Sequence, residues 1–201
     1  AERASRDERR HAVLCAELAD RYGAPAPPIG AASPAEIAPS GLGPQQRVLY
    51  EVVAACCVTE TESMGVLTRL LAVARDPRLR EVLRELARDE VHHSRLGWAH
   101  LAGEHARGDV SFLGPFVPAM LRGAMEPDLF AAVPAERDDA ALLEHGVLPH
   151  DAQRQVFTRT LEEVVFPGLE AYGVDTAPAR RWLGAQAPPA TSRDEPGPRS
   201  S

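Results

Sequence analysis

Glutamate and histidine recur three residues apart in this sequence, a spacing that can place two metal ligands on one helical face. Glu90 and His93 show it in Asp-Glu-Val-His-His, and Glu8 and His11 show it in Asp-Glu-Arg-Arg-His. On an α-helix such residues lie one turn apart, so their carboxylate and imidazole can hold one divalent metal ion. A single Glu-x-x-His is weak evidence, because a charged, solvated helix face produces it by chance.

The two copies have the character of an internal repeat. Their glutamates are 82 residues apart, and a leucine follows each histidine at the same distance, Leu14 after His11 and Leu96 after His93. Self-similarity at a fixed interval indicates duplication of a structural unit. Two copies on separate helices therefore favour a metal site shared between them.

Long helices must position these groups. Residues 2–22, 45–75 and 77–106 each carry apolar side chains every three or four residues, the period of an amphipathic helix. Pro77 predicts a tight break between the second and third helices. Residues 23–44 are rich in Pro, Gly and Ala and lack helical periodicity, so we expect a crossover that runs the length of a bundle.

A third carboxylate, Glu60, interrupts the apolar stripe of the 45–75 helix. It lies 16 residues before residue 76, while Glu90 and His93 lie 14 and 17 residues after it. With a rise of about 1.5 Å per residue in an antiparallel pair, all three side chains fall at nearly one height. Glu60 then needs a proton, a cation or a metal, because burying an uncompensated charge is costly.

At these residues the chain resembles the ferritin-like superfamily, in particular bacterial ferritin-like domain proteins whose helices carry Asp-Glu-x-x-His before a run rich in Ala and Leu. The resemblance covers about residues 5–106. It implies an all-α, ferritin-like helical bundle with a long crossover, in which two helices supply a Glu and two supply Glu-x-x-His. Carried onto this chain, it assigns five metal ligands: Glu8, His11, Glu60, Glu90 and His93.

The order in the superfamily is Glu, Glu-x-x-His, Glu, Glu-x-x-His, and the first lone Glu is missing here. The repeat interval places a partner for Glu60 at position −22, before the first residue. Together with the absence of an initial Met, this suggests an N-terminal truncation that removed the first bundle helix. The alternative is that Glu162 or Glu163 supplies the fourth carboxylate, although neither lies on the apolar stripe of its helix.

The ligand set defines the expected chemistry. Carboxylates with imidazoles suit iron, manganese or zinc, and two bridged ions leave open positions for dioxygen or water. The resemblance implies a non-haem di-metal protein, with di-iron favoured over manganese or zinc, that acts on dioxygen or a small-molecule substrate as an oxidase, oxygenase or ferroxidase. Each histidine also needs a hydrogen-bond partner, and Asp7 and Asp89 can pair only across the bundle.

Two other functions stay open. A metal-free structural or interaction bundle is motivated by the missing Glu. Iron storage is the further alternative, although the sequence reveals no surface for assembling a cage. A homodimer is compatible with each of these functions.

Composition excludes several classes of protein. The formal charge of −7 argues against nucleic acid as a partner, because phosphates select basic surfaces. All 22 basic residues are arginine, so chemistry that needs a lysine is excluded. The three cysteines form no C-x-x-C and no disulfide framework, which favours a reducing compartment. Neither a membrane span nor a signal peptide is visible, so we expect a cytoplasmic bacterial protein.

We expect three regions: a bundle core over 1–106, a C-terminal helical extension over 107–186 that packs on it, and a disordered tail over 187–201. Within the extension, helices are predicted at 110–126, 137–146, 150–172 and 177–185. Pro167 predicts a kink or an early end of the 150–172 helix.

Three side chains near the predicted ligands have simpler explanations than metal binding. Cys15 and Cys57 each lie about one turn from a ligand and are expected to be small core residues. Glu62 lies on a stripe beside that of Glu60 and is expected to be solvated or paired with arginine.

Overall fold

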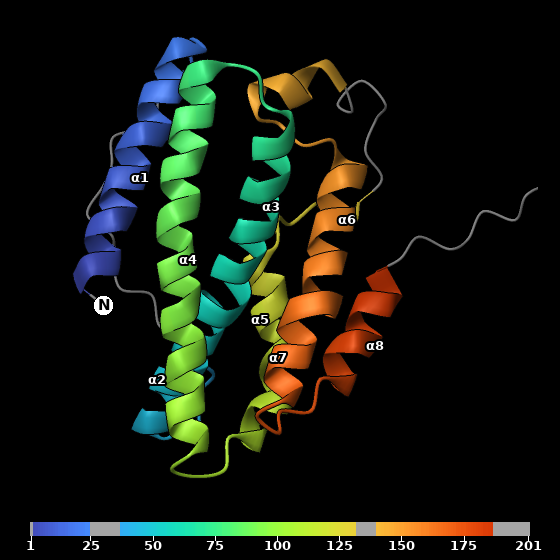
Figure 1. Cartoon of the computed structure of the whole chain (residues 1–201). Coiled ribbons are helices and arrows are strands. Elements are labelled where there is room, and N and C mark those ends of the chain that lie inside the picture. The colour runs from blue at the N-terminus through green and yellow to red at the C-terminus, as the bar shows by residue number, and fades with distance from the viewer. Residues whose placement is uncertain (1, 25–36, 132–139, 187–201) are drawn as a thin grey trace, which may run out of the picture.

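The computed structural model describes residues 2–24, 37–131 and 140–186, and all regular structure in these ranges is helical. As the periodicity predicts, long helical stretches form an all-α bundle (Figure 1). The stretches are α1 (Glu2–Arg21), the continuous run 44–73, α4 (Pro77–His105) and the continuous run 150–170. Residues 25–36 of the predicted crossover and the predicted tail over 187–201 lie outside the described residues.

The run 44–73 is built from α2 (Pro44–Val52), the π-helical segment η1 (Val53–Thr59) and α3 (Glu60–Val73). α1 ends at one end of the bundle and α2 begins at the other, so the connection between them starts and finishes at opposite ends (Figure 1). This is the arrangement that a long crossover requires. α4 then returns antiparallel to α3.

Local sequence explains the sharp reversal between α3 and α4. The Asp76 carboxylate accepts a hydrogen bond from the Leu79 backbone N–H at 2.8 Å, and Pro77 occupies the first turn of α4. Arg80 donates to the carbonyls of Leu71 and Ala74, each at 2.8 Å, which satisfies the end of α3. The reversal therefore fixes the register in which α3 and α4 face each other.

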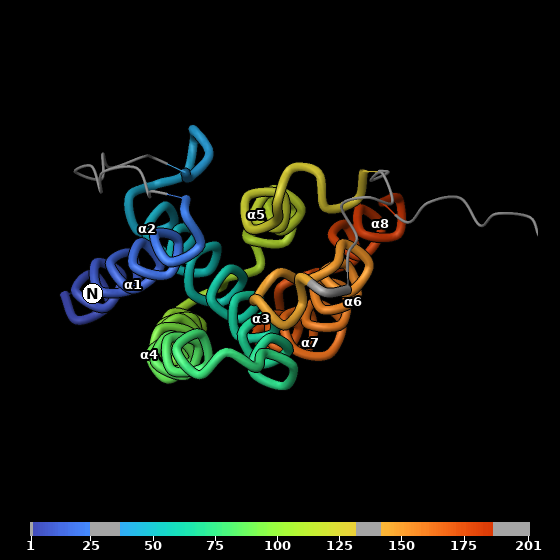
Figure 2. Tube along the Cα trace, turned by 90° about the horizontal axis from the view of Figure 1, so that it is seen from above, coloured from blue at the N-terminus to red at the C-terminus, as the bar shows by residue number. Residues whose placement is uncertain are grey.

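Seen along the bundle axis, α3 lies between α4 on one side and α6 (His150–Thr160) on the other (Figure 2). α1 packs against α4. α5 (Val117–Ala124) covers η1, and α8 (Ala177–Gln186) packs against α5. The elements that carry the predicted metal ligands, α1, α3 and α4, thus form one side of the bundle.

Two predicted helices differ from those observed, the first of them because of proline. The 110–126 helix begins as a 3₁₀ turn, η2 (Ser111–Phe116), and only then becomes α5, since Pro115 and Pro118 remove backbone donors. The predicted 137–146 helix appears as a 3₁₀ turn, η4 (Ala140–His145), and its first three residues lie outside the described ones.

Of the two outcomes predicted at Pro167, a kink or an early end of the helix, the early end is not found. The run 150–170 passes from α6 through a π-helical segment, η5 (Leu161–Val165), into α7 (Phe166–Glu170). Proline has no backbone N–H to donate, and the π-helical hydrogen bonds directly before Pro167 adjust the helix to this missing donor. The helix therefore continues through the proline.

The apolar interior has two parts with a polar layer between them. On α3 and α4 the smaller part contains Leu67, Leu70, Ala74, Leu79 and Leu83. The larger part gathers side chains from both sides of the predicted boundary at residue 106. Its fully buried members include Val53, Val58, Leu101, Phe157, Leu161 and Phe166. Glu60 on α3 and both Glu90 and His93 on α4 fall between these two parts along their helices.

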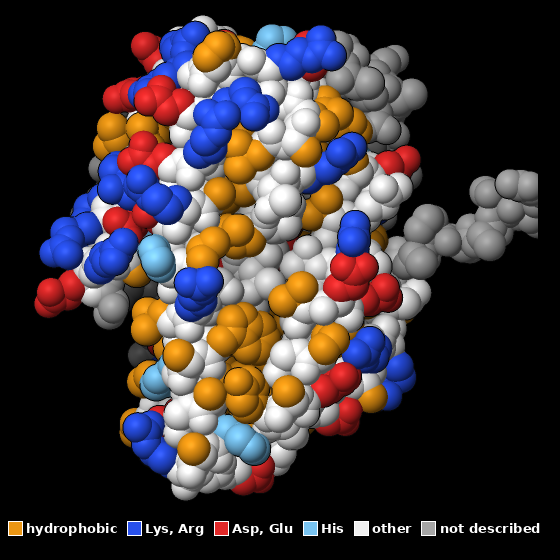
Figure 3. Space-filling view, viewed as in Figure 1, with side chains coloured by type: hydrophobic (Ala, Val, Ile, Leu, Met, Phe, Trp, Pro, Cys, Tyr) orange, Lys and Arg blue, Asp and Glu red, His pale blue; other side chains and the backbone are white. Residues whose placement is uncertain are grey.

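Apolar side chains also reach the surface. In the view of Figure 3 they collect over the lower half of α4 and its border with α7. The indole of Trp98 on α4 lies so close to Gly168 on α7 that a Cβ at Gly168 would come within 2.6 Å of it. In the described part of the chain, no helix has the length and apolar character needed to cross a membrane.

Candidate metal centre

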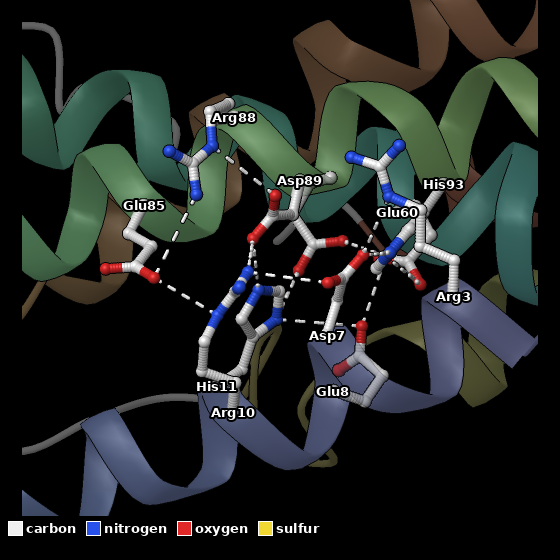
Figure 4. Close-up of polar contacts among 11 residues, drawn as sticks. Arg3, Asp7, Glu8, Arg10, His11, Glu60, Glu85, Arg88, Asp89 and His93 are labelled. Atoms are coloured by element: carbon white, nitrogen blue, oxygen red, sulfur yellow. Dashed lines mark hydrogen bonds and ion pairs between the residues drawn. The ribbon is translucent and has the colours of Figure 1, made fainter.

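Three helices bring carboxylate and imidazole groups to one point (Figure 4). α1 contributes Glu8, α3 contributes Glu60, and α4 contributes Glu90 and His93. Each offers one potential ligand atom, and these four atoms lie within 4.8 Å of one another. Glu90 and His93 are buried, Glu60 is partly buried, and Glu8 is exposed. Such a group has the donor types and spacing that a divalent transition metal requires.

His93 turns one ring nitrogen toward this point. Its Nδ1 lies 3.0 Å from a Glu90 oxygen, 3.1 Å from a Glu8 oxygen and 4.0 Å from a Glu60 oxygen. Its Nε2 lies on the opposite side of the ring, 3.4 Å from the Asp7 carboxylate. The ring is therefore held between the carboxylate cluster and a partner on α1.

His11 lies at the edge of the same cluster. Its side chain is buried, and its Nδ1 lies 3.5 Å from a Glu90 oxygen and 3.6 Å from a Glu8 oxygen. The two imidazole centroids are 6.1 Å apart. All five side chains that the sequence nominates thus meet in one place, with His11 slightly outside the tightest group of four; their role as metal ligands stays a prediction.

The aspartate that precedes each motif glutamate contacts the histidine of the other helix. Asp7 of α1 contacts His93 of α4, and Asp89 of α4 contacts His11 of α1 at 3.2 Å, each through Nε2 (Figure 4). This cross-bundle pairing fixes which nitrogen of each ring faces the cluster. Carboxylate partners of this kind orient histidines and raise their strength as ligands.

Arginines neutralise the aspartates but do not contact the three glutamates. Arg10 bonds to both Asp7 and Asp89, and Arg3 and Arg88 add one ion pair each. Burial opposes ionisation of Asp89, but its bond with His11 and the two nearby arginines bring its pKa below the ordinary value. Among the described residues, no arginine forms an ion pair with Glu8, Glu60 or Glu90.

Two of these glutamates, Glu60 and Glu90, consequently have pKa values above the ordinary one. Burial, a hydrogen bond with Glu90 and the nearby charges of Glu90 and Glu8 raise the pKa of Glu60 to about 8. Burial likewise raises the pKa of Glu90, partly opposed by the hydrogen bond that it makes with Glu60. Without a cation, Glu60 and Glu90 retain a proton between them at neutral pH.

The π-helical segment η1 ends at Glu60 and sets its direction. The Glu60 backbone N–H bonds to the carbonyl of Ala55, five residues back, and the Thr59 hydroxyl donates to the carbonyl of Ala54 at 3.0 Å. π-Helical turns are frequent at functional sites, because they rotate the side chains that follow. Periodicity alone did not predict this segment, since its apolar residues fit an α-helix equally well.

The other acidic residues and the cysteines near the predicted ligands agree only in part with the expectations from the sequence. Glu162 and Glu163 are both exposed, Glu163 pairs with Arg159, and neither joins the cluster. Cys57 is buried as expected, but Cys15 is exposed. Glu62 is partly buried, and burial and the nearby Glu126 raise its pKa to about 7, so the expectation of a solvated or arginine-paired group is wrong.

Comparison with protein-family models, with curated proteins and with solved structures finds no match for this chain. The class of protein is therefore defined by the molecule itself. It is an all-α helical bundle with a carboxylate–histidine cluster between its apolar layers.

Asp89→Asn is expected to weaken the binding of Mn²⁺ or Zn²⁺ by about 10–100-fold without removing any proposed ligand. The substitution deletes the charge that orients His11 and leaves the side-chain shape nearly unchanged. Glu85→Gln is the matched control, because Glu85 lies one turn earlier on α4 and pairs with Arg10 and Arg88 but touches no histidine. Titration calorimetry on both variants measures the effect, and equal affinities would contradict the orienting role.

Proposed function

We propose that this protein binds divalent transition-metal ions at the cluster of Glu8, His11, Glu60, Glu90 and His93, and that the bound centre is dinuclear and most suited to iron. The proposal extends to a dioxygen-dependent oxidase, oxygenase or ferroxidase activity of the ferritin-like type.

One observation carries the proposal. Glu8, Glu60 and Glu90 come from three different helices to within 4.8 Å of a shared imidazole. Arg3, Arg10 and Arg88 pair with Asp7 or Asp89 instead. Concentrating carboxylates in this way costs free energy in the absence of a positive charge. A metal ion is the partner that matches both the geometry and the charge.

The donor set fits the group that the resemblance implies. Glu8 and Glu90 each lie near the Nδ1 atoms of both imidazoles, so these four residues, with Glu60, would hold the ions. Bound iron in such a site would supply the redox chemistry with dioxygen. The residues of this chain hold the ions, orient the imidazoles through Asp7 and Asp89, and limit water through the apolar layers on either side.

Metal analysis tests the proposal directly. Untagged protein, stripped with a chelator and then supplied with Fe²⁺ without oxygen or with Mn²⁺ at neutral pH, is expected to retain two ions per chain. One ion per chain would support metal binding but contradict a dinuclear centre. Less than one ion per chain would overturn the proposal.

A metal-free structural or interaction bundle is the second candidate. The observation that favours it is the carboxylate count, because the described cluster holds three glutamates where the ferritin-like pattern has four, and the side chain of Glu8 is 53% exposed. Under this alternative the retained proton between Glu60 and Glu90 is the permanent state of the site. Iron storage would in addition require assembly of many chains, which a measurement of size in solution tests.

A further inference from the structure

A cavity of about 280 Å³ lies between the run α2–η1 and α5, and Glu60 is one of its lining residues. We propose that it binds a small, uncharged, mainly apolar molecule, and that this molecule is the substrate of the metal centre. The second part of this inference rests on the proposed function.

The dimensions of the cavity limit its ligand. Tyr50 and Glu60 both line it and are ten residues apart on one continuous helical run, a span of about 12–15 Å at the helical rise. At about 30 Å³ for each water-sized group, the volume holds roughly nine heavy atoms. One short chain or one single ring fits this space, and a fused ring system does not.

The lining selects against charge. Most of the lining is apolar and includes Ala54, Ala119 and Met120, and among the described lining residues only Glu60 has a carboxyl group. Burying the charge of an anionic ligand against these apolar side chains would be costly, and none of the lining residues that the structure describes is an arginine that could balance it. Small apolar molecules gain free energy when they leave water for such a surface.

Its walls are well ordered by packing. The Tyr50 side chain is buried, and its ring lies edge-on against Phe116, with centroids 6.0 Å apart. The Thr59 hydroxyl is engaged by the carbonyl of Ala54. The segment η1 thus supplies part of the cavity wall and ends directly before Glu60, so a molecule in the cavity would lie next to a member of the carboxylate cluster.

A larger cavity of about 750 Å³ lies between α6 and α8, but it is less suited to this role. None of the five proposed ligands lines it. Its three arginines already pair with acidic residues, Arg154 with Asp151, Arg159 with Glu163 and Arg180 with Glu170.

Binding can be measured first in metal-free protein, where it does not depend on the proposed function. The probes are n-hexanol and its anionic counterpart hexanoate, and the signal is the NMR resonance of methyl-labelled methionine. Met120 lines the cavity, whereas Met64 lines a different groove and serves as an internal reference. We expect n-hexanol to shift the Met120 resonance saturably and hexanoate to bind at least ten-fold more weakly.

Substitutions that fill the cavity should abolish the effect. Ala119→Phe is expected to weaken n-hexanol binding at least ten-fold, and Gly123→Phe, whose new Cβ would meet nothing within 4 Å, is a second variant in case the first fails to fold. Ala72→Phe, at an exposed site on α3 outside this cavity, is the control. The absence of a Met120 shift, or equal binding of hexanoate, would overturn the inference.

Added Mn²⁺ then tests the link to the metal centre. A bound paramagnetic ion should accelerate relaxation of the n-hexanol protons in the wild-type protein and not in Ala119→Phe. Normal relaxation with Mn²⁺ demonstrably bound would refute the substrate assignment alone. If Mn²⁺ fails to bind, the proposed function and the substrate assignment both fall, while binding of n-hexanol in the metal-free protein still stands on its own.

Discussion

Glu60→Gln is expected to make the metal-free protein more stable and, at the same time, to abolish its stabilisation by metal. Burial and like charges raise the pKa of Glu60 from 4.5 to about 8, so the folded state holds a proton that the unfolded state releases. This penalty is absent below pH 4.5 and grows until about pH 8. Its removal should raise the free energy of unfolding by on the order of 2 kcal/mol at pH 7.

The wild-type protein should respond to metal in the opposite direction. An ion present at about 100 times its dissociation constant stabilises the fold by roughly 2.7 kcal/mol, whereas a glutamine amide is a poor ligand and should weaken binding at least 100-fold. Urea unfolding with and without Mn²⁺, at pH 4.5 and pH 7, measures both effects. Glu163→Gln is the control, because Glu163 is exposed and outside the cluster. Equal metal responses in wild type and Glu60→Gln would remove Glu60 from the centre.

Gly97→Ala is expected to separate α4 from η1 and to damage both stability and metal binding. A Cβ at Gly97 would lie 2.5 Å from the Cβ of Cys56, 2.9 Å from its backbone carbon and 3.0 Å from the backbone nitrogen of Cys57. Backbone atoms cannot yield as a flexible side chain can, so α4 itself must shift. We expect a loss of about 2 kcal/mol, despite the higher helix propensity of alanine, and a fall in metal affinity of at least ten-fold.

Gly103→Ala tests the same change on the same helix without the clash. The nearest atom to its new Cβ is the end of the Arg107 side chain at 3.8 Å, an ordinary contact. This variant should be slightly more stable than the wild type, by less than about 1 kcal/mol. Thermal unfolding and metal titration of both variants measure the difference. Similar behaviour of the two would show that the contact of α4 with η1 is dispensable.

The sequence predicted those features that depend on regular spacing. Apolar periodicity placed α1, α3 and α4, and the distances of Glu60, Glu90 and His93 from the break at residue 76 correctly brought them to one height. Both follow from the constant rise of a helix, which a sequence displays directly. The assignment of these residues as metal ligands remains to be tested by metal analysis.

Features that depend on how the helices pack against one another could not be predicted from the sequence in this way. The π-helical segments before Glu60 and Pro167 arise from packing, and their apolar residues have no distinctive pattern. Cys15 fits the stripe of Glu8 and His11 by spacing, yet α1 packs chiefly on α4, which leaves Cys15 exposed. Glu62 was misjudged because its burial depends on the surroundings of α3, where Glu126 lies near in space but far in sequence.

Asp7 of α1 contacts His93 of α4, and Asp89 of α4 contacts His11 of α1. Neither Asp-Glu-x-x-His copy is therefore complete without the other. Each segment supplies the anchor that its counterpart's imidazole requires, so a fragment holding one copy would lack a correctly aimed ring. Two identical single-copy chains related by a two-fold axis would satisfy the same requirement. Joining both copies in one polypeptide makes their encounter independent of protein concentration.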